Sequence, residues 1–548
     1  MASAAQVGRR FHHETERCRV ALNAPCWPER DSAHLLVTGV QMAALEQELF
    51  ASGLPVEALM EKAALAVATA IQADWGERLA RHGAVVLTGP GHNGGDGLVV
   101  ARELHLAGID VAIWSPFERH KPLTAAHLNH ARWLGIPVEQ AAPEPAGPAL
   151  WIDALFGIGQ SRPLTEPTAS LLDQRHRLQP GALVAIDVPS GLDDTSGAPL
   201  GATTAMAATT YTIGLIKRGL VQDGALAAVG RLQRIDLGLP APLLQNLEAA
   251  TPLGLSAADC CSGVPLLPPL DPAASKYERG RLLVIAGSDA YRGAALLALL
   301  GADASGLGSL RAALPQSLAA GLWQQLPHVV LQRQLNCSSE GALQLSELAA
   351  SDLERLDAVL LGPGIGALEQ GAHVAETEAA AWDLLQRFSG LLVLDADGLN
   401  RINPDWLQKR RGPSWITPHR GEFARLWPQW AELPPLDAAP RAAAASGAAV
   451  LLKGARSVIA APDGRCWQLL EAAPSSARAG LGDVLAGYVS AQGAMALASG
   501  AHGDATGLAA AACAHAWAGT MAAGSGSTSP AAVAQQLSQQ RKTEVILK

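Results

Sequence analysis

The chain has 548 residues, 49% of them hydrophobic and 17% charged, and it carries a net charge of -9. This length and composition predict an enzyme with more than one buried core, and we expect two large domains rather than an interaction tail. The negative charge argues against nucleic acid as the main ligand, and seven cysteines without a Cys-x-x-Cys pair indicate neither a disulfide framework nor a zinc site, so we expect a cytoplasmic protein.

Residues 1–33 are expected to form a disordered extension. Arg9 and Arg10 could begin a twin-arginine export signal, but no apolar stretch follows them, and an organellar transit peptide is the other alternative. Thr38 and Gln41 have the spacing of a capping box at the start of a helix. The folded part is therefore expected to begin near residue 34.

The first half of the chain alternates apolar runs with helical stretches, which is typical of a parallel sheet with helices on both faces. The runs are residues 84–88, 110–114, 150–152, 182–186 and 209–213. We expect a Rossmann-like domain over residues 34–240. Prolines accumulate from residue 239 to residue 272, and we expect the linker at residues 241–250.

A second series of apolar runs predicts another α/β domain over residues 251–541. The runs are residues 281–286, 358–361, 391–394, 415–417 and 449–452. Residues 484–503 carry no charge and are long enough for a membrane span, but Ser490, Gln492 and His502 favour a buried helix pair, so we expect no membrane association. A further helix is expected over residues 506–521.

A glycine-rich turn follows the first run, where Gly89, Gly91 and Gly94 match G-x-G-x-x-G. The free N–H groups and the dipole of the following helix favour a phosphate group there, and a nicotinamide dehydrogenase is one interpretation of this single match. Asn93 and Asp96 stand among the glycines, where an amide and a carboxylate could hold a cation or move a proton.

Polar residues also follow two further apolar runs of the first half, at Asp153, Asp187 and Ser190. The carboxyl ends of parallel strands line one crevice, so we expect these side chains to converge with Asn93. Asp153 or Ser190 alone would more often be a cap or turn residue. Three such turns at strand ends favour a site.

Residues 59–63, 91–102, 153–159, 187–192 and 210–219 resemble the motifs of NAD(P)H-hydrate epimerase across most of the first domain. The resemblance implies that Asp187 is catalytic and that a potassium ion is bound by Asn93, Asp153 and Ser190. It also implies a hydrate-binding set made of His92, Asn93, Gly94, Gly95, Asp96, Gly157, Ile158, Gly159, Gln160, Ser161, Arg162, Pro163 and Asp187. His92 stands where the family usually has Asn, and Ile158 where it usually has Thr.

The second half contains no G-x-x-x-x-G-K-[ST] motif, so a nucleotide there is not held by a P-loop. Residues 479–487 instead form a glycine turn entering an apolar helix, with amides for a phosphate group. Asp483 near that helix start is as consistent with an N-cap as with a general base, and His419 alone would more often be structural. Polar turns at residues 286–288, 362–366, 395–400, 417–422 and 453–457 complete the pattern.

These turns, in order and spacing, resemble the ADP-dependent NAD(P)H-hydrate dehydratase, which has a ribokinase-like fold. The resemblance implies that Asp483 removes a proton from the ring hydroxyl as that hydroxyl attacks the β-phosphate of ADP, the co-substrate, with Mg²⁺. It implies hydrate contacts at Ala294, Gly366, His419 and Asp483, and ADP contacts at Lys453, Gly454, Ala455, Arg456, Ser457 and Gly482. Leu481 departs from the Thr or Ser usual in the family, and Tyr277 from a glycine.

The sequence thus predicts a bifunctional isomerase and lyase that repairs hydrated NADH and NADPH. The first domain would interconvert the R and S hydrates, and the second would dehydrate the S hydrate to NAD(P)H, AMP and phosphate. We expect small-molecule substrates and a homo-oligomer. Two alternatives are a ribokinase-like small-molecule kinase with an attached non-catalytic nucleotide-binding domain, and a scaffold, since domains like the first also occur in RNA-decapping proteins.

Overall fold

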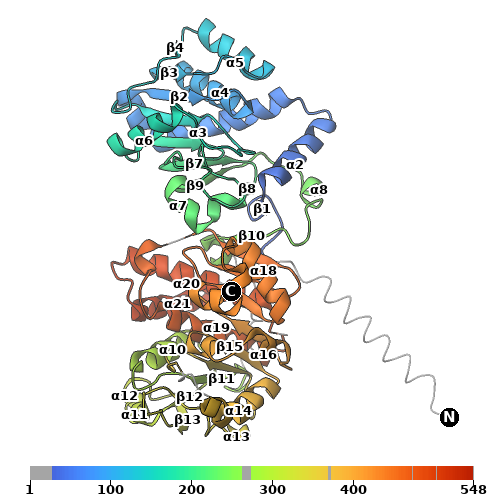
Figure 1. Ribbon diagram of the computed structural model, residues 1–548, viewed down its shortest axis with the longest axis vertical. Helices are drawn as coiled ribbons and strands as arrows, with labels where there is room; N and C mark the ends of the chain where they lie inside the picture. The colour runs from blue at the N-terminus through green and yellow to red at the C-terminus, as the bar shows by residue number, and fades with distance from the viewer. Residues whose placement is uncertain (1–26, 262–272, 368–371, 472, 502, 547–548) are drawn as a thin grey trace, which may run out of the picture.

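The computed structural model describes residues 27–261, 273–367, 372–471, 473–501 and 503–546. Figure 1 shows two lobes stacked along the long axis, with the first domain in blue to green and the second in yellow to red. Each lobe is built on one large, mainly parallel sheet. These sheets confirm the expected fold class, a Rossmann-like parallel-sheet domain followed by a ribokinase-like α/β domain.

The sheet of the first domain has seven strands, all parallel, in the order β4-β3-β2-β5-β6-β7-β9. Their bounds are β2 Ala84–Thr88, β3 Val111–Trp114, β4 Val138–Glu139, β5 Leu150–Ala154, β6 Leu183–Ile186, β7 Thr209–Ile213 and β9 Arg231–Ile235. The chain runs outward from β2 in one direction and from β5 in the other. The point between these two strands is where open α/β sheets bind ligands.

The helices of the first domain connect its strands and cover the sheet (Figure 1). They are α2 Gly39–Ala51, α3 Val56–His82, α4 His92–Leu106, α5 Pro122–Trp133, α6 Thr168–Leu178 and α7 Leu226–Val229, with the short 3-10 helices η1 Arg218–Val221 and η2 Asp223–Ala225. Thr38 and Gln41 form the expected capping box at the start of α2.

The sheet of the second domain has ten strands in the order β10-β19-β18-β17-β16-β15-β14-β11-β12-β13, and only β18 pairs antiparallel to its neighbours. Their bounds are β10 Leu253–Leu255, β11 Arg281–Ile285, β12 Ser309–Pro315, β13 Val330–Leu335, β14 Ala358–Leu361, β15 Leu391–Leu394, β16 Ser414–Ile416, β17 Ala449–Leu452, β18 Val458–Ala460 and β19 Cys466–Leu469. Leu282 and Val284 face one core and Leu283 and Ile285 the other, because successive side chains of a strand alternate.

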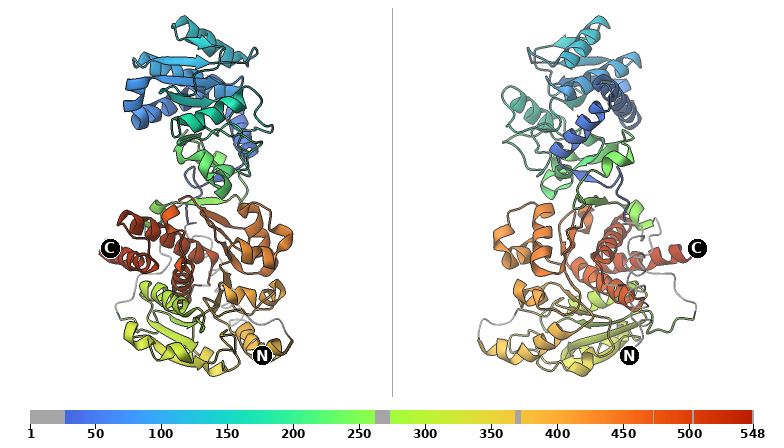
Figure 2. Two further views of the ribbon diagram at one scale, coloured as in Figure 1. Left: turned by 60° about the vertical axis from the view of Figure 1, so that its left-hand side comes forward. Right: turned by 90° about the vertical axis from the view of Figure 1, so that its right-hand side faces the viewer.

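Helices cover both faces of this sheet. Figure 2 shows the C-terminal helices in red on one side and residues 372–446 in orange and gold on the other. The first group is α10 Arg292–Ala304, α19 Leu481–Ala498, α20 Ala505–Gly524 and α21 Pro530–Ile546. The second includes α14 Ala372–Arg387, α16 Pro404–Gln408 and α18 Pro435–Ser446. Shorter helices are α8 Ala241–Leu244, α9 Ala257–Cys261, α11 Gln316–Ala319, α12 Leu322–Gln325, α13 Ala350–Leu353, α15 Asp397–Asn400 and α17 Arg420–Leu426, with η3 Pro428–Trp430 and η4 Pro474–Ser476.

Two glycines fix α19 against α10. A Cβ at Gly487 would lie 1.9 Å from the carbonyl oxygen of Ala298, and one at Gly301 would lie 2.1 Å from that of Val484. Only glycine permits the two helix backbones to approach so closely. This contact sets the position of the first turn of α19, which carries Asp483.

The two domains share a junction built partly from the start of the fold. Strand β1 (Leu36–Val37) pairs in parallel with β8 (Ile216–Lys217) of the first domain, while Leu35 forms an isolated bridge with Leu253 of β10. His34 contributes a carbonyl to Gly254 N at 2.6 Å and a ring nitrogen 2.9 Å from Asp259. The first described residues therefore contact both domains.

The structure corrects the expected start of the fold. Residues 1–26 lie outside the described residues, but residues 27–33 are ordered: Trp27 is buried, and Arg30 donates to the carbonyl of Glu248 at 2.8 Å. The interval 241–250 contains α8, because prolines are tolerated in the first turn of a helix. Among the described residues no helix is long and apolar enough to cross a membrane.

Candidate active sites

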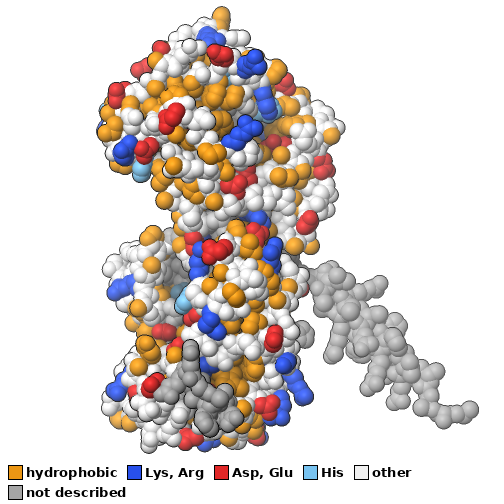
Figure 3. Space-filling model, viewed as in Figure 1, with side chains coloured by type: hydrophobic (Ala, Val, Ile, Leu, Met, Phe, Trp, Pro, Cys, Tyr) orange, Lys and Arg blue, Asp and Glu red, His pale blue; other side chains and the backbone are white. Residues whose placement is uncertain are grey.

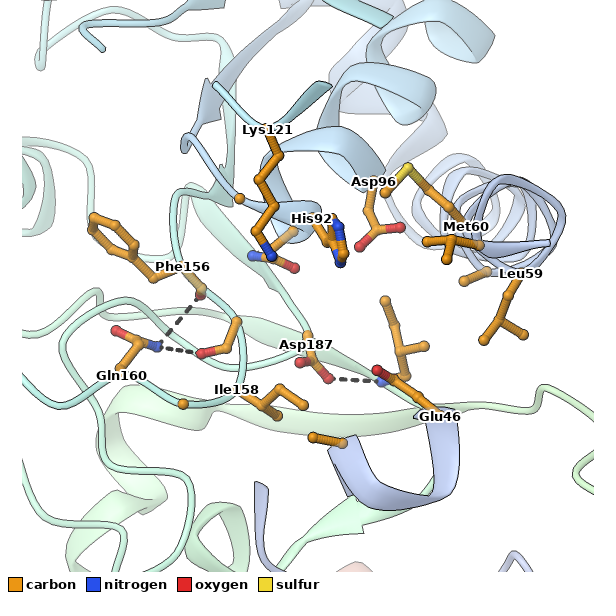
Figure 4. A pocket seen from close by; sticks show the side chains of 18 of the residues that line it. Glu46, Leu59, Met60, His92, Asp96, Lys121, Phe156, Ile158, Gln160 and Asp187 are labelled. Carbon is orange, nitrogen blue, oxygen red and sulfur yellow. Dashed lines mark hydrogen bonds between the residues drawn. The ribbon is translucent and has the colours of Figure 1, made fainter. Parts of the chain in front are cut away.

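A cavity of about 480 Å³ opens in the first domain beside the point between β2 and β5. Helices α2 and α3 and the turns after β2 and β5 enclose it (Figure 4). The expected site residues that line it are His92, Asn93, Asp96, Gly157, Ile158, Gly159, Gln160 and Asp187. The structure thus brings together residues that are up to 95 positions apart in the sequence, from His92 to Asp187.

Five residues of the expected hydrate-binding set do not line the cavity. Gly94 and Gly95 are buried beneath it, and a Cβ at Gly94 would lie 1.9 Å from the carbonyl oxygen of Gly89, so this turn needs a glycine. Ser161, Arg162 and Pro163 are exposed on the following loop. They would have to move to touch a ligand held in the cavity.

Asp187 follows β6 with a φ of 67°, a conformation that is rare and costly for a residue other than glycine. The buried ammonium group of Lys217, on β8, forms an ion pair with its Oδ1 atom. Lys217 also donates to the carbonyl of Ile213 at 2.6 Å, and Ile213 N donates to Asp187 Oδ1 at 3.2 Å. These contacts fix the carboxyl group of Asp187 at the cavity wall (Figure 4).

Two further carboxyl groups face Asp187 across the cavity, as Figure 4 shows for Glu46 and Asp96. Burial, with a contribution from the charge of Asp187, raises the pKa of Glu46 to about 6. Burial and the charges of Asp187 and Glu46 raise the pKa of Asp96 well above its usual range. Sequence reasoning missed Glu46, although its position four residues after Met42 places it on the apolar side of α2.

The three expected cation ligands lie where strand ends meet. Ser190 donates from Oγ to Asp153 Oδ1 at 2.7 Å and from its backbone N–H to Oδ2 at 2.8 Å. Burial raises the pKa of Asp153 to about 6 against the effect of these hydrogen bonds. Asn93 Oδ1 is buried and has no hydrogen-bond partner in the part of the chain that the structure describes. An unpaired buried oxygen beside an all-oxygen donor set fits a hard cation such as potassium.

The expected nucleotide site of the second domain forms around Asp395, at the end of β15. Lys453 Nζ donates to Asp395 Oδ1 at 2.6 Å, and Thr417 Oγ1 donates to the same atom at 2.8 Å. Burial opposes the charge on Lys453, but the Asp395 and Glu422 carboxylates outweigh it and raise the pKa of Lys453. A Cβ at Gly482 would lie 3.7 Å from Lys453 Nζ, so the lysine reaches the first turn of α19.

Asp483 is not the N-cap of α19. Gly480 occupies the cap position with a φ of 88°, and Asp483 lies in the first turn of the helix. Burial and the nearby Asp395 carboxylate raise the pKa of Asp483 to about 7, although Lys453 acts in the opposite direction. A carboxyl group that titrates near neutral pH has the proton affinity expected of a general base. Leu481 beside it is buried in the core and offers no hydroxyl to a ligand.

The remaining expected residues of the second domain surround this turn with different roles. His419 caps α17, where Nδ1 accepts from Gly421 N at 2.9 Å and from Glu422 N at 3.2 Å. Gly366 N donates to Asp397 Oδ2 at 2.9 Å. A Cβ at Gly364 would lie 2.5 Å from the Cβ atom of Ala294, which places Ala294 beside the turn after β14. Residues 453–457 form the turn between β17 and β18.

No group of three or more His, Cys, Asp or Glu side chains in the described ranges is arranged to hold a metal ion. The Mg²⁺ expected with ADP therefore remains a prediction.

Comparison with known proteins assigns both domains. Residues 56–219 match the family described as YjeF-related protein N-terminus, and residues 282–542 match the NAD(P)H-hydrate dehydratase family. A bifunctional NAD(P)H-hydrate repair enzyme of Gloeobacter violaceus is 44% identical over 463 residues, which cover 83% of this chain and 88% of the relative. The chain belongs to the family of bifunctional NAD(P)H-hydrate repair enzymes. The resemblance stated from the sequence is thereby confirmed.

A second curated relative agrees with this assignment. A repair enzyme of the same description from Synechocystis is 41% identical over 461 residues, covering 83% of this chain and 84% of the relative. The crystal structure of the ADP/ATP-dependent NAD(P)H-hydrate dehydratase from Bacillus subtilis is 26% identical, with a TM-score of 0.41, and covers 53% of this chain and 97% of that chain.

Proposed function

We propose that the first domain interconverts the R and S hydrates of NADH and NADPH and that the second uses ADP to dehydrate the S hydrate. Family membership supports the pair of activities. The geometry supports their division between two separate sites, one around Asp187 and one around Asp483. A repair enzyme with both activities would recover both epimers through one stereospecific dehydratase.

Epimerisation requires the ring hydroxyl to leave one face of the dihydronicotinamide ring and water to return to the other. The hydroxyl-bearing carbon is a hemiaminal, so the ring nitrogen can expel the hydroxyl group once that group receives a proton. Glu46 and Asp96, whose pKa values are raised by burial, are groups that can donate it. Asp187, held in place by its ion pair with Lys217, can accept a proton from the returning water.

A potassium ion would be held by Asn93, Asp153 and Ser190, as the oxygen donors of the first domain suggest. Such a cation would add positive charge to the buried turns that carry the hydrate-binding residues. In this arrangement Asn93 would serve two functions, since its backbone lies at the start of α4 beside the cavity and its side-chain oxygen would be a ligand of the ion. Asp153 and Ser190 would fix the turns after β5 and β6 relative to each other.

Dehydration would begin with the S hydrate and ADP side by side at α19. Asp483 takes the proton of the ring hydroxyl while the hydroxyl oxygen attacks the β-phosphorus of ADP and AMP leaves. The resulting phosphate ester then loses inorganic phosphate, a better leaving group than hydroxide, while the neighbouring ring carbon loses a proton to water, and the ring regains its double bond. Lys453 and the amides near Gly482 would compensate the phosphate charge, with Mg²⁺ accompanying the nucleotide.

The observation that carries this proposal is the carboxyl group of Asp483, with its pKa near 7, in the helix turn that Lys453 reaches. The test is to supply purified R or S hydrate with ADP and to follow NADH absorbance and AMP together. Wild type should consume both epimers, and Asp187→Asn should consume only the S hydrate beyond the spontaneous rate. Phosphorylation of a vitamin or sugar from a panel, without hydrate turnover, would instead support the small-molecule kinase.

We further propose that the enzyme works in the cytoplasm as a homo-oligomer. Cys260, Cys337, Cys466 and Cys513 are free thiols, in keeping with a reducing compartment. Trp133 on α5 is 78% exposed and stacks on His130, which offers an apolar surface to a second copy. Light scattering and localisation of a tagged full-length chain would test the two statements.

A further inference from the structure

A contact across the domain junction reaches the nucleotide turn of the second domain. Figure 1 shows β8 and α7 of the first domain directly above the second, and Figure 3 shows charged side chains of both signs at the narrow junction. Asp223, which begins η2, accepts hydrogen bonds through Oδ2 from Ala455 N at 3.0 Å and through Oδ1 from Arg456 N at 2.9 Å. One carboxylate of the first domain thus binds two successive amides of the second.

The contact lies at the edge of a buried set of hydrogen bonds between the domains. Arg456 is 9% exposed and donates from Nη1 to the carbonyl of Leu220 at 3.3 Å. Gln468 on β19 donates to the carbonyl of Val221 at 2.9 Å, and its Oε1 atom accepts from Gln222 Nε2 at 3.0 Å. Because bulk water is excluded from these buried groups, their hydrogen bonds are stronger and hold residues 220–222 firmly against the second domain.

The turn has little internal support of its own. Gly454 N donates to Ser457 Oγ at 3.3 Å, and Ser457 Oγ in turn lies 3.3 Å from the carbonyl of Gly454. The carboxylate approaches the turn closely: a Cβ at Gly454 would lie 2.6 Å from Asp223 Oδ2. The turn directly follows Lys453, so its position and that of the lysine are coupled through one peptide bond.

We propose that Asp223 is a positioning residue that holds residues 454–456 in the conformation that binds ADP, so that the epimerase domain completes the nucleotide site of the dehydratase domain. This inference rests on the proposed function, in which residues 453–457 contact ADP. Asp223 touches neither the hydrate nor the reacting phosphate. It acts through the backbone of the turn.

The same geometry allows an opposite role, which the test must separate. A carboxylate on two amides also resembles an anion bound to backbone N–H groups, so Asp223 could compete with a phosphate of ADP. Removing a positioning group weakens ADP binding, whereas removing a competitor or a repelling charge strengthens it. The sign of the change in KM for ADP therefore decides between the two roles.

The experiment compares Asp223→Ala and Asp223→Asn with Arg218→Ala in the full chain. Arg218 bridges the same junction through an ion pair with Asp437 at 3.1 Å, without contacting residues 454–456, and is the matched control for a loosened junction. We measure KM for ADP, KM for the S hydrate and kcat, with epimerisation of the same preparations as a measure of the intact first domain.

Asp223→Ala should raise KM for ADP about tenfold, the effect expected on losing hydrogen bonds to a charged acceptor, while kcat and KM for the hydrate stay within about twofold. Asp223→Asn keeps one acceptor oxygen, so its KM for ADP should lie between those of Asp223→Ala and wild type. The KM of Arg218→Ala for ADP should equal that of wild type. An unchanged or lowered KM for ADP, or an equal rise in Arg218→Ala, overturns the inference. Absence of ADP binding to wild type by calorimetry would instead overturn the proposed function, and Asp223→Asn decides the matter if Asp223→Ala does not fold.

Discussion

Dehydration should depend on pH through Asp483, because only the ionised carboxylate can accept the hydroxyl proton. Its pKa of about 7 implies that about one tenth of the enzyme is active at pH 6 and about nine tenths at pH 8. The kcat for dehydration should therefore rise about tenfold across this interval and level off above it. Rates are measured by NADH absorbance with ADP and S hydrate both saturating.

The β-phosphate of ADP also titrates near pH 6, so a control variant is needed to show that the rise in kcat comes from the enzyme and not from ADP. Asp397→Asn serves this purpose, since the charge of Asp397 contributes to the raised pKa of Asp483 and the amide can still accept from Gly366 N. The variant should move the rise to lower pH, while the titration of ADP stays where it is. Asp405→Asn removes an exposed charge that does not act on Asp483 and should leave the profile in place. A profile that is flat, or that Asp397→Asn does not shift, refutes Asp483 as the titrating base.

Four further outcomes are expected. Asp483→Asn should lower dehydration by about 10² to 10⁴ while calorimetry still detects ADP, and near-normal NADH recovery would require another base. Asp187→Asn should lower epimerisation by a similar factor in chiral chromatography but spare dehydration of the S hydrate; rapid epimer exchange would exclude Asp187. Lys217→Met removes the partner of a buried carboxylate and should slow epimerisation about 10- to 100-fold, with a wild-type rate arguing against the pair. Asp153→Ala should slow epimerisation and abolish its response to potassium, and a wild-type enzyme indifferent to potassium removal would contradict the cation site.

The sequence predicted the central strands well because each is a short apolar run ended by a polar turn. Residues 209–213, 358–361, 391–394 and 449–452 are strands with those bounds. Strands β10, β12, β13, β18 and β19 of the second sheet were missed, and they include parallel as well as antiparallel pairings. The early start of the fold was missed because Trp27 is a single apolar residue in a polar segment, and its burial depends on distant contacts.

The candidate sites were predicted where a residue stands in a strand-end turn, as Asp187 and Asp483 do. Glu46 and Lys217 were not identified as site residues, because each reaches its site from an element that does not end at the crevice. Asp223 was beyond prediction for a different reason. Its partners lie more than 230 positions away in another domain, and only the docking of the two domains brings them together.

The segment formed by residues 34–37 has a consequence for dividing the enzyme. It pairs with β8 in the first domain and reaches Leu253 and Asp259 in the second, so covalent continuity at residues 241–250 is only one of several connections between the halves. A protease cut in that interval should yield two fragments that co-elute and keep both activities, much as a nicked enzyme does. A chain that starts at residue 38 would lose this segment, and its halves would then be joined by the linker and by the junction contacts of residues 218–223.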